Sequence, residues 1–289
     1  MDGQSPIRNV SDTALWVATW RAMESERPDA LFNDPYARRL GGARGEAIAA
    51  RMGGKRDNWP IVVRTVVMDE IVARSVREGV RTVLNLAAGL DTRPYRMDLP
   101  ADLAWLHVDM PAMVDYYRTH MAGETPRCAL ELVAADLRDP TLRRQLFERV
   151  AALPGPLLVI TEGLLLYLES DQVAALSRDL HDFARADLWL TDLASPQLLA
   201  YLAKRRGASR ARENAPFRFG PAEGSAFFAA HGWREREFHS TMVDAYRLKR
   251  TMPLGWFWRL LSLLQPRQRR RDALRMSSVV VLERQERVA

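Results

Sequence analysis

The residues best suited to chemistry follow two short apolar runs in the first half of the chain. The run 82–86 breaks into Ala88 and Gly89, and an apolar strand that ends in small residues is how open α/β sheets form a cofactor crevice. Gly89 can adopt a positive φ, and small side chains let a ligand approach the backbone closely. Asp109 stands twenty residues after Gly89, at the end of the run 104–109, where a carboxylate can accept hydrogen bonds from two ribose hydroxyls. The spacing therefore predicts a nucleoside cofactor.

The loop contains one glycine, whereas a full GxGxxG pattern contains three. A pyrophosphate-binding loop is therefore a weak interpretation. A cofactor without phosphates, such as S-adenosylmethionine, fits this short loop better than NAD does. One alternative stays open, in which the same residues form only a tight turn between a strand and a helix.

Six motifs occur along the chain, and their order is more specific than any one of them. They are SDTALWVATWRAMES (11–25), NDPYARRL (33–40), VVRTVVMDE (62–70), NLAAGLDTR (85–93), ADLRD (135–139) and TEGLLLYL (161–168). Together they resemble the leucine carboxyl methyltransferase family and, more closely, its bacterial branch of S-adenosylmethionine-dependent O-methyltransferases. The chain departs from the family at Ala87, where the family usually has glycine.

The resemblance implies an α/β fold of the class I methyltransferase type. This fold is a Rossmann-like seven-stranded sheet with an N-terminal helical cap and an inserted substrate-covering subdomain. The implied cofactor is S-adenosylmethionine, and the resemblance places its carboxylate on Arg64, since a guanidinium binds a carboxylate bidentately. Ala88, Gly89, Asp109 and Met110 complete this part of the predicted cofactor site. The alternative for Arg64 is a surface position on an amphipathic helix.

Three further residues belong to the implied cofactor site. The resemblance assigns the carboxylate of Asp136 to the adenine amine and the backbone amide of Leu137 to a ring nitrogen. Asp136 could instead cap the following helix, although Asp139 is better placed to do so. Glu162 follows the buried run 156–161 and could bond the cofactor's amino group or orient Arg64.

Tyr167 and Arg93 are the predicted catalytic residues. Tyr167 could reach the point of methyl transfer or simply pack in the core. Arg93 could position the loop, and it or an arginine of the segment 204–218 could hold an acidic acceptor. Methyl transfer depends on alignment and desolvation, and a carboxylate acceptor is already ionised at neutral pH and needs no general base.

The predicted reaction is therefore methylation of a carboxylate on a small-molecule metabolite or biosynthetic intermediate. Two alternatives are methylation of a hydroxyl in polyketide or other secondary-metabolite tailoring, and cofactor binding without transferase activity. Five histidines and one cysteine show no metal-ligand spacing, so no metal is predicted. Nucleic-acid binding is not favoured, because no basic segment is interleaved with aromatic residues.

Composition limits the setting in which the protein works. Its 289 residues carry a net charge of +6, which could attract nucleic acid, a membrane surface or an acidic substrate, or could reflect an arginine-favouring composition. Cys128 is the only cysteine, and the first ten residues lack the apolar core of a signal peptide, so a cytoplasmic location is predicted. The longest apolar run, 156–168, is too short for a transmembrane segment.

The apolar periodicity predicts the elements that position these residues. Strands are predicted at 82–86, 104–109, 130–135, 156–161, 188–191, 233–238 and 276–282, the last two as an antiparallel edge pair. Helices are predicted at 11–25, 36–40, 61–79, 111–120, 142–150, 170–184 and 221–231, with a glycine-marked loop at 41–45.

Four regions follow from this order. Residues 1–79 form a helical cap within the same domain, and 80–194 form the S-adenosylmethionine-binding core. Residues 195–232 form a substrate-lid insertion, and 233–289 form the strand pair with a connector helix. Within the last region, 253–264 is apolar nearly all round and is followed by arginines up to 271. This segment could contact a membrane surface, form a dimer contact, or be a buried connector.

Overall fold

The computed structural model describes residues 10–51, 58–204, 216–252, 255 and 266–286. Its centre is one seven-stranded sheet with the strand order β3-β2-β1-β4-β5-β7-β6. Strands β1 to β5 are parallel, and β7 runs antiparallel to both β5 and β6. The strands are β1 (Thr82–Leu86), β2 (Ala104–Asp109), β3 (Ala129–Ala134), β4 (Leu157–Thr161), β5 (Leu188–Ala194), β6 (Trp233–Ser240) and β7 (Ser277–Arg284). The predicted fold class and the antiparallel edge are thereby confirmed.

The middle of the sheet explains where a ligand can bind. β1 pairs with β2 on one side and with β4 on the other, so the strand order reverses at β1. Every residue of β1 and β4 is buried, as expected for parallel strands covered on both faces. Open α/β sheets bind ligands outside the carboxyl ends of the strands at such a reversal.

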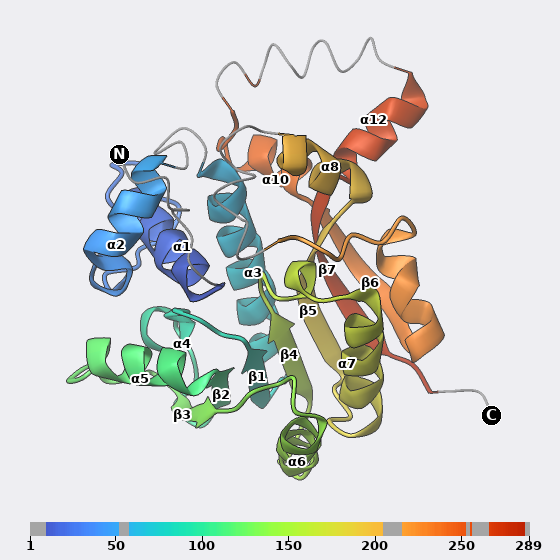
Figure 1. Cartoon of the computed structure of the whole chain (residues 1–289). Helices are drawn as coiled ribbons and strands as arrows, with labels where there is room; N and C mark the ends of the chain where they lie inside the picture. Colours follow the sequence, from blue (N-terminus) through green and yellow to red (C-terminus); the bar gives the residue numbers. More distant parts are fainter. Residues whose placement is uncertain (1–9, 52–57, 205–215, 253–254, 256–265, 287–289) are drawn as a thin grey trace.

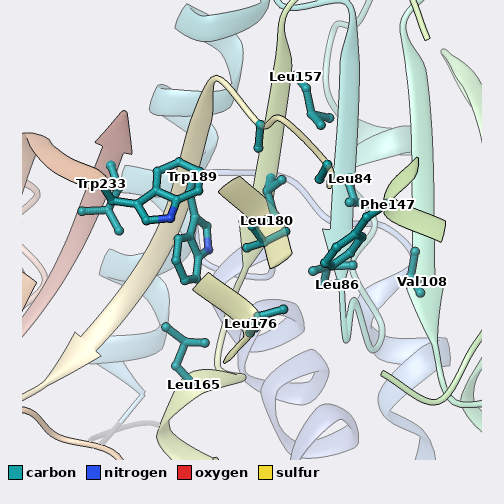
Figure 2. Close-up of a cluster of buried hydrophobic side chains, with 14 of the residues drawn as sticks. Leu84, Leu86, Val108, Phe147, Leu157, Leu165, Leu176, Leu180, Trp189 and Trp233 are labelled. Atoms are coloured by element: carbon teal, nitrogen blue, oxygen red, sulfur yellow. The ribbon is translucent and has the colours of Figure 1, made fainter. Parts of the chain in front are cut away.

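Helices cover both faces of the sheet. One face carries α6 (Pro140–Ala151), α7 (Ser170–Asp182) and the 3-10 helix η3 (Gly224–His231) over a core that includes Phe147, Trp189 and Trp233. Figure 2 shows the two tryptophans of this core side by side, and their ring centroids are 5.4 Å apart. The other face carries α3 (Trp59–Arg77), the short α4 (Arg93–Arg96), α5 (Pro111–His120) and α10 (Thr241–Arg247).

The N-terminal helices α1 (Val10–Ser25) and α2 (Ala37–Arg51) pack against each other (Figure 1). The loop predicted at 41–45 is wrong, because these residues lie inside α2, which has a kink at Gly42 with φ 56°. A Cβ atom on either Gly41 or Gly45 would lie 2.5 Å from Oγ1 of Thr19. These two glycines therefore permit close contact with α1 and do not end the helix.

Three helices of the second half were not predicted. They are α8 (Pro196–Lys204), α10 and α12 (Arg267–Leu274), and Figure 1 shows them grouped at the top of the view. The predicted apolar helix at 253–264 lies outside the described residues except for Gly255. Among the described helices, none is long and apolar enough to cross a membrane. The division into four regions stays a prediction.

Candidate functional site

A cavity of about 1650 Å³ opens at the carboxyl ends of the central strands. It is lined by the loop after β1, the ends of β2, β4 and β5, and parts of α1 and α3. All ten residues predicted from the sequence to form the site line this one cavity: Arg64, Ala88, Gly89, Arg93, Asp109, Met110, Asp136, Leu137, Glu162 and Tyr167.

Asp109 fixes the loop that follows β1. Its Oδ2 accepts a hydrogen bond from the backbone amide of Gly89 at 2.7 Å, and its Oδ1 accepts one from Met110 at 2.7 Å. Burial raises the pKa of this carboxyl above its ordinary value, and the two amide bonds offset part of that rise. A carboxylate has about four lone-pair positions, so two remain for hydroxyl donors of a ligand.

The loop itself contains two departures from ordinary backbone conformation. Gly89 has φ 55°, the left-handed region that glycine adopts without strain. Ala87 has φ 50°, where a Cβ atom costs about 1 to 2 kcal/mol. The left-handed φ gives a physical reason for the glycine that the resemblance of the motifs leads us to expect at position 87.

Glu162 lies at the end of β4 between two guanidinium groups. Its Oε1 accepts from Nε of Arg64 at 3.0 Å, and its Oε2 accepts from Nη1 of Arg93 at 2.8 Å. Burial alone would raise the pKa of Glu162, but the two arginines outweigh it and lower the pKa to about 2. Glu162 is therefore ionised at neutral pH, and its contact with Arg64 is the one expected if it orients that arginine, one of the two roles considered from the sequence.

Asp192, on β5, was not among the predicted residues. Its Oδ2 accepts from Nη1 of Arg64 at 3.0 Å, and its Oδ1 accepts from the backbone amide of Gly163 at 2.6 Å. Arg64 thus lies between two carboxylates in the wall of the cavity, with 14% of its side chain exposed. The signal that could have identified Asp192 is its place directly after the predicted strand 188–191, at the same edge of the sheet as Glu162.

Arg93 is held by three carboxylates, and only 2% of its side chain is exposed. Besides Glu162, it donates to Asp69 of α3 at 2.7 Å and to Asp91 of its own loop at 3.0 Å. Burial would lower the pKa of Arg93, but the carboxylates raise it well above its ordinary value. Asp69 and Asp91 were missed, although both stand within the quoted motifs. Arg93 therefore positions the loop, α3 and β4 relative to one another.

Arg21 connects helix α1 to the loop after β1. Its guanidinium donates to Asp34 at 2.9 Å and to the backbone carbonyl of Leu90 at 2.6 Å. Asp34 also accepts from the hydroxyl of Thr92 at 2.7 Å. These bonds fix α1 directly against the loop after β1, so α1 forms one wall of the cavity.

The ion pairs join into one cluster that contains one more acid than base. It holds five carboxylates and four guanidinium groups: Asp34, Asp69, Asp91, Glu162 and Asp192, with Arg21, Arg64, Arg93 and Arg96. The formal excess of one negative charge favours a ligand with positive charge at this end of the cavity.

The remaining predicted residues lie apart from that cluster. Asp136 bonds to Arg138, and about a third of its side chain is exposed. The helix after it is capped by Asp139, whose side chain accepts from the amides of Thr141 and Leu142, so Asp136 is not needed as a cap. Tyr167 lies on the 3-10 helix η2 (Leu165–Tyr167).

The surroundings of Tyr167 are apolar and aromatic. It packs against a cluster that contains Trp16 and Trp20, and its ring centroid lies 5.4 Å from that of Phe217.

Among the described residues that line the cavity there is no histidine. Nor do the described ranges of the chain hold a group of three or more His, Cys, Asp or Glu side chains placed to bind a metal ion.

Comparison with known proteins gives a family match and close relatives. The chain matches the family described as leucine carboxyl methyltransferase over residues 14–181. A protein of Parafrankia sp. (strain EAN1pec), named "Putative S-adenosyl-L-methionine-dependent methyltransferase", is 33% identical over 268 residues, which cover 84% of this chain and 83% of that protein. A protein named in the same way from Mycolicibacterium paratuberculosis is 37% identical over 178 residues, 55% of this chain and 58% of that protein.

Solved structures share the fold at lower sequence identity. A DUF574-family protein from Streptomyces avermitilis superposes with a TM-score of 0.57 at 15% identity, covering 92% of this chain and 96% of that one. A "putative methyltransferase" from Thermobifida fusca superposes with a TM-score of 0.52 at 15% identity, covering 98% and 96%. At these identities the likeness concerns the fold alone.

Proposed function

The chain belongs to the leucine carboxyl methyltransferase family and is an S-adenosylmethionine-dependent methyltransferase, and we propose that it methylates a carboxylate oxygen of a small acidic molecule. The observation that carries the proposal is the convergence of all ten predicted residues on one cavity at the reversal of strand order.

The single cysteine, Cys128, is buried and cannot form an intrachain disulfide, which fits our further proposal of a cytoplasmic location.

The residues of the cavity fit S-adenosylmethionine. Asp109 has lone pairs left for the ribose hydroxyls after it has accepted two amides. Arg64 would hold the carboxylate of the methionine part through Nη2, since its bonds to Glu162 and Asp192 use Nε and Nη1. Glu162 and Asp192 would lie near the amino group of that part. Asp136 and Leu137 would hold the adenine. The excess negative charge of the ion cluster suits a cofactor with a positively charged sulfur and amino group.

When bound, S-adenosylmethionine supplies a methyl group on a positively charged sulfur, which an oxygen nucleophile can displace. The protein's own task is then to align the acceptor and exclude water. The bonds from Arg21 of α1 to Asp34 and to the carbonyl of Leu90 hold one wall rigidly in place. Tyr167 and its aromatic neighbours form another wall, and we propose that Tyr167 contacts the acceptor.

The lack of a histidine among the described lining residues supports a carboxylate acceptor more than a hydroxyl. A hydroxyl must lose its proton, which a positioned base assists, whereas a carboxylate is ionised already. The described lining contains no histidine, and Glu162 and Asp192, the two acids beside Arg64, are engaged in ion pairs. Neither acid is therefore placed as a free base.

Arg51 is the candidate to attract the acceptor's carboxylate. Eight described arginines line the cavity, and seven of them are paired with carboxylates: Arg21, Arg64, Arg93, Arg96, Arg138, Arg143 and Arg218. Within the described part of the chain, no ion pair involves Arg51, which ends α2. It replaces Arg93 in this role, because Arg93 is saturated by three acids.

The first test is calorimetric titration of the wild type and of Asp109→Ala with S-adenosylmethionine and S-adenosylhomocysteine. Micromolar binding that is lost in the variant is expected. Absence of binding to the wild type would remove the basis for the assigned cofactor site.

The second test identifies the bond that is made. Carboxylic acids and the corresponding alcohols are offered with the cofactor, and products are analysed by mass before and after mild alkali. A methyl ester releases its methyl group in alkali and a methyl ether does not. Alkali-stable products from alcohols alone would contradict the carboxylate proposal and favour the hydroxyl alternative.

A further inference from the structure

The cavity has a second half that the cofactor residues do not use. Aromatic and aliphatic side chains line it, contributed by α1, the start of α3, η2, the segment 216–219 and α8. We name this half the apolar chamber and define it by Trp16, Trp20, Trp59, Tyr167, Phe217 and Leu202. Its walls come from segments far apart in the sequence, and two of them, η2 and α8, follow strands β4 and β5.

Helix α8 presents apolar side chains to the chamber. It is amphipathic, and Leu198, Leu199 and Leu202 all line the cavity. None of the residues of α8 is buried in the structure. Apolar residues on one face of a surface helix normally bury against a core. Within the described ranges these side chains stay partly exposed and line the cavity, so an apolar ligand bound there would remove them from water.

The size of the cavity leaves room for such a ligand beside the cofactor. Its volume is about 1650 Å³. Small-molecule sites usually occupy about 300 to 1,000 Å³. The cavity therefore exceeds the usual site for one molecule.

The charges next to the chamber argue against an acceptor with many polar groups. The seven paired arginines of the cavity are already bound to carboxylates of the protein. Arg51 remains as one cation for one anionic group. The indole Nε1 atoms of Trp16 and Trp20, which have no hydrogen-bond partner among the described residues, add two donors to the chamber. A ligand with many more hydrogen-bonding groups is disfavoured there, because most of them would lose water without replacement.

We propose that the methyl acceptor is an apolar carboxylic acid, a medium-chain or polycyclic hydrocarbon skeleton with one carboxylate, whose apolar part occupies the apolar chamber. The inference rests on the proposed function, since it specifies the acceptor of that same site. A peptide with a free carboxyl terminus is a different class of acceptor, and the experiment below separates it from an apolar acid.

The experiment measures binding to the full chain in the presence of S-adenosylhomocysteine. The probes are acetate, decanoate, 2-naphthoate and a short polar peptide with a free carboxyl terminus. Their binding is measured by calorimetry and by tryptophan fluorescence. Decanoate or naphthoate should bind at least about tenfold more tightly than acetate, because transfer of apolar surface from water scales with its area. Binding should also change the fluorescence, since Trp16, Trp20 and Trp59 belong to the chamber.

Two variants locate the effect. Leu202→Ser should weaken decanoate binding at least about tenfold and leave the affinity for S-adenosylhomocysteine unchanged. Leu142→Ser is the matched control, because Leu142 is 45% exposed on α6 and does not line the cavity. It should change neither affinity.

The outcomes are distinguishable. If S-adenosylhomocysteine binds but all acids bind alike, or the peptide binds best, the apolar-acid proposal is wrong and the methyltransferase assignment stands. The apolar-acid proposal is also wrong if decanoate binds equally to the wild type and to Leu202→Ser. If S-adenosylhomocysteine itself fails to bind, the assigned cofactor site is wrong, and the acceptor proposal that depends on it is wrong as well.

Discussion

The carboxylate of Asp109 accepts a hydrogen bond from the backbone amide of Gly89, with the two atoms 2.7 Å apart. The same side chain is thus the proposed ribose ligand and the anchor of the loop that the cofactor must approach. Its second oxygen accepts from the amide of Met110, so the carboxylate is fixed before any ligand arrives. Such preorganisation reduces the entropy lost on binding.

Asp109→Asn should therefore weaken S-adenosylhomocysteine binding by about ten- to one hundredfold. Asparagine offers one oxygen where aspartate offers two, so one amide or the ribose loses a charge-assisted bond of about 1.5 to 3 kcal/mol. Calorimetry measures the change. Asp115→Asn is the matched control, since Asp115 is 72% exposed on α5 and pairs with Arg118. Equal affinities in both variants would mean that Asp109 does not contact the cofactor.

Arg93→Lys should lower the free energy of unfolding by about 3 kcal/mol or more. Lysine keeps the charge but cannot donate to Asp69, Asp91 and Glu162 from a planar fork, and breaking a buried ion pair typically costs about 3 to 5 kcal/mol. Urea denaturation measures the loss. Arg144→Lys, in a pair with Glu148 that is more than half exposed on both sides, should change stability by less than about 0.5 kcal/mol.

The residues of the site that lie directly at the ends of strands could be predicted from the sequence. Asp109 and Glu162 could be predicted because each follows an apolar run, and the carboxyl ends of parallel strands meet at one edge of the sheet. Strands β1, β2, β4, β5 and β7 could be predicted because buried strands are short apolar runs bounded by turn residues. β3 and β6 are mostly exposed or half-buried, so their signal was weaker. These signals depend on neighbours in the sequence.

The partners of the arginines could not be predicted in this way. Arg64 reaches Asp192 across 128 residues, and Arg93 reaches Glu162 across 69 residues. No periodicity relates such positions, because the contact is set by how the strands are ordered in the sheet. Gly41 and Gly45 were misjudged for a similar reason, since their role is contact with Thr19 on another helix.

Ala87→Gly and Ala88→Gly should change stability in opposite directions. Ala87 has φ 50°, so glycine relieves a strain of about 1 to 2 kcal/mol and loses about 0.4 to 1 kcal/mol to the greater entropy of the unfolded chain. The expected net change therefore lies between about zero and a gain of about 1.6 kcal/mol. Ala88 is not at positive φ, and its glycine variant should only lose stability. Thermal unfolding of both variants measures the signs, and a loss in both would contradict a strained Ala87.

His107 should make the protein less stable as the pH falls from about 6.5 to about 4. It is fully buried, its Nε2 lies 3.2 Å from the carbonyl oxygen of Gly89, and burial lowers its pKa from 6.5 to about 4. Between these values the unfolded chain binds a proton that the native state does not. The free energy of unfolding therefore decreases as the pH is lowered from about 6.5 to about 4, by about 3 kcal/mol in all. Above about pH 6.5 this histidine does not make stability depend on pH.

His107→Gln is the variant that isolates this effect. Glutamine can donate to the carbonyl of Gly89 but does not titrate, so the difference in unfolding free energy between variant and wild type should shrink or reverse as the pH falls. Urea denaturation at about pH 7.5 and about pH 5 measures it. Glu162, whose pKa is lowered from 4.5 to about 2, reduces stability mainly below about pH 4.5, and its contribution is the same in both proteins. If both proteins lose stability in parallel, the acid sensitivity comes from other groups and His107 is not the buried neutral imidazole that stacks on Tyr117.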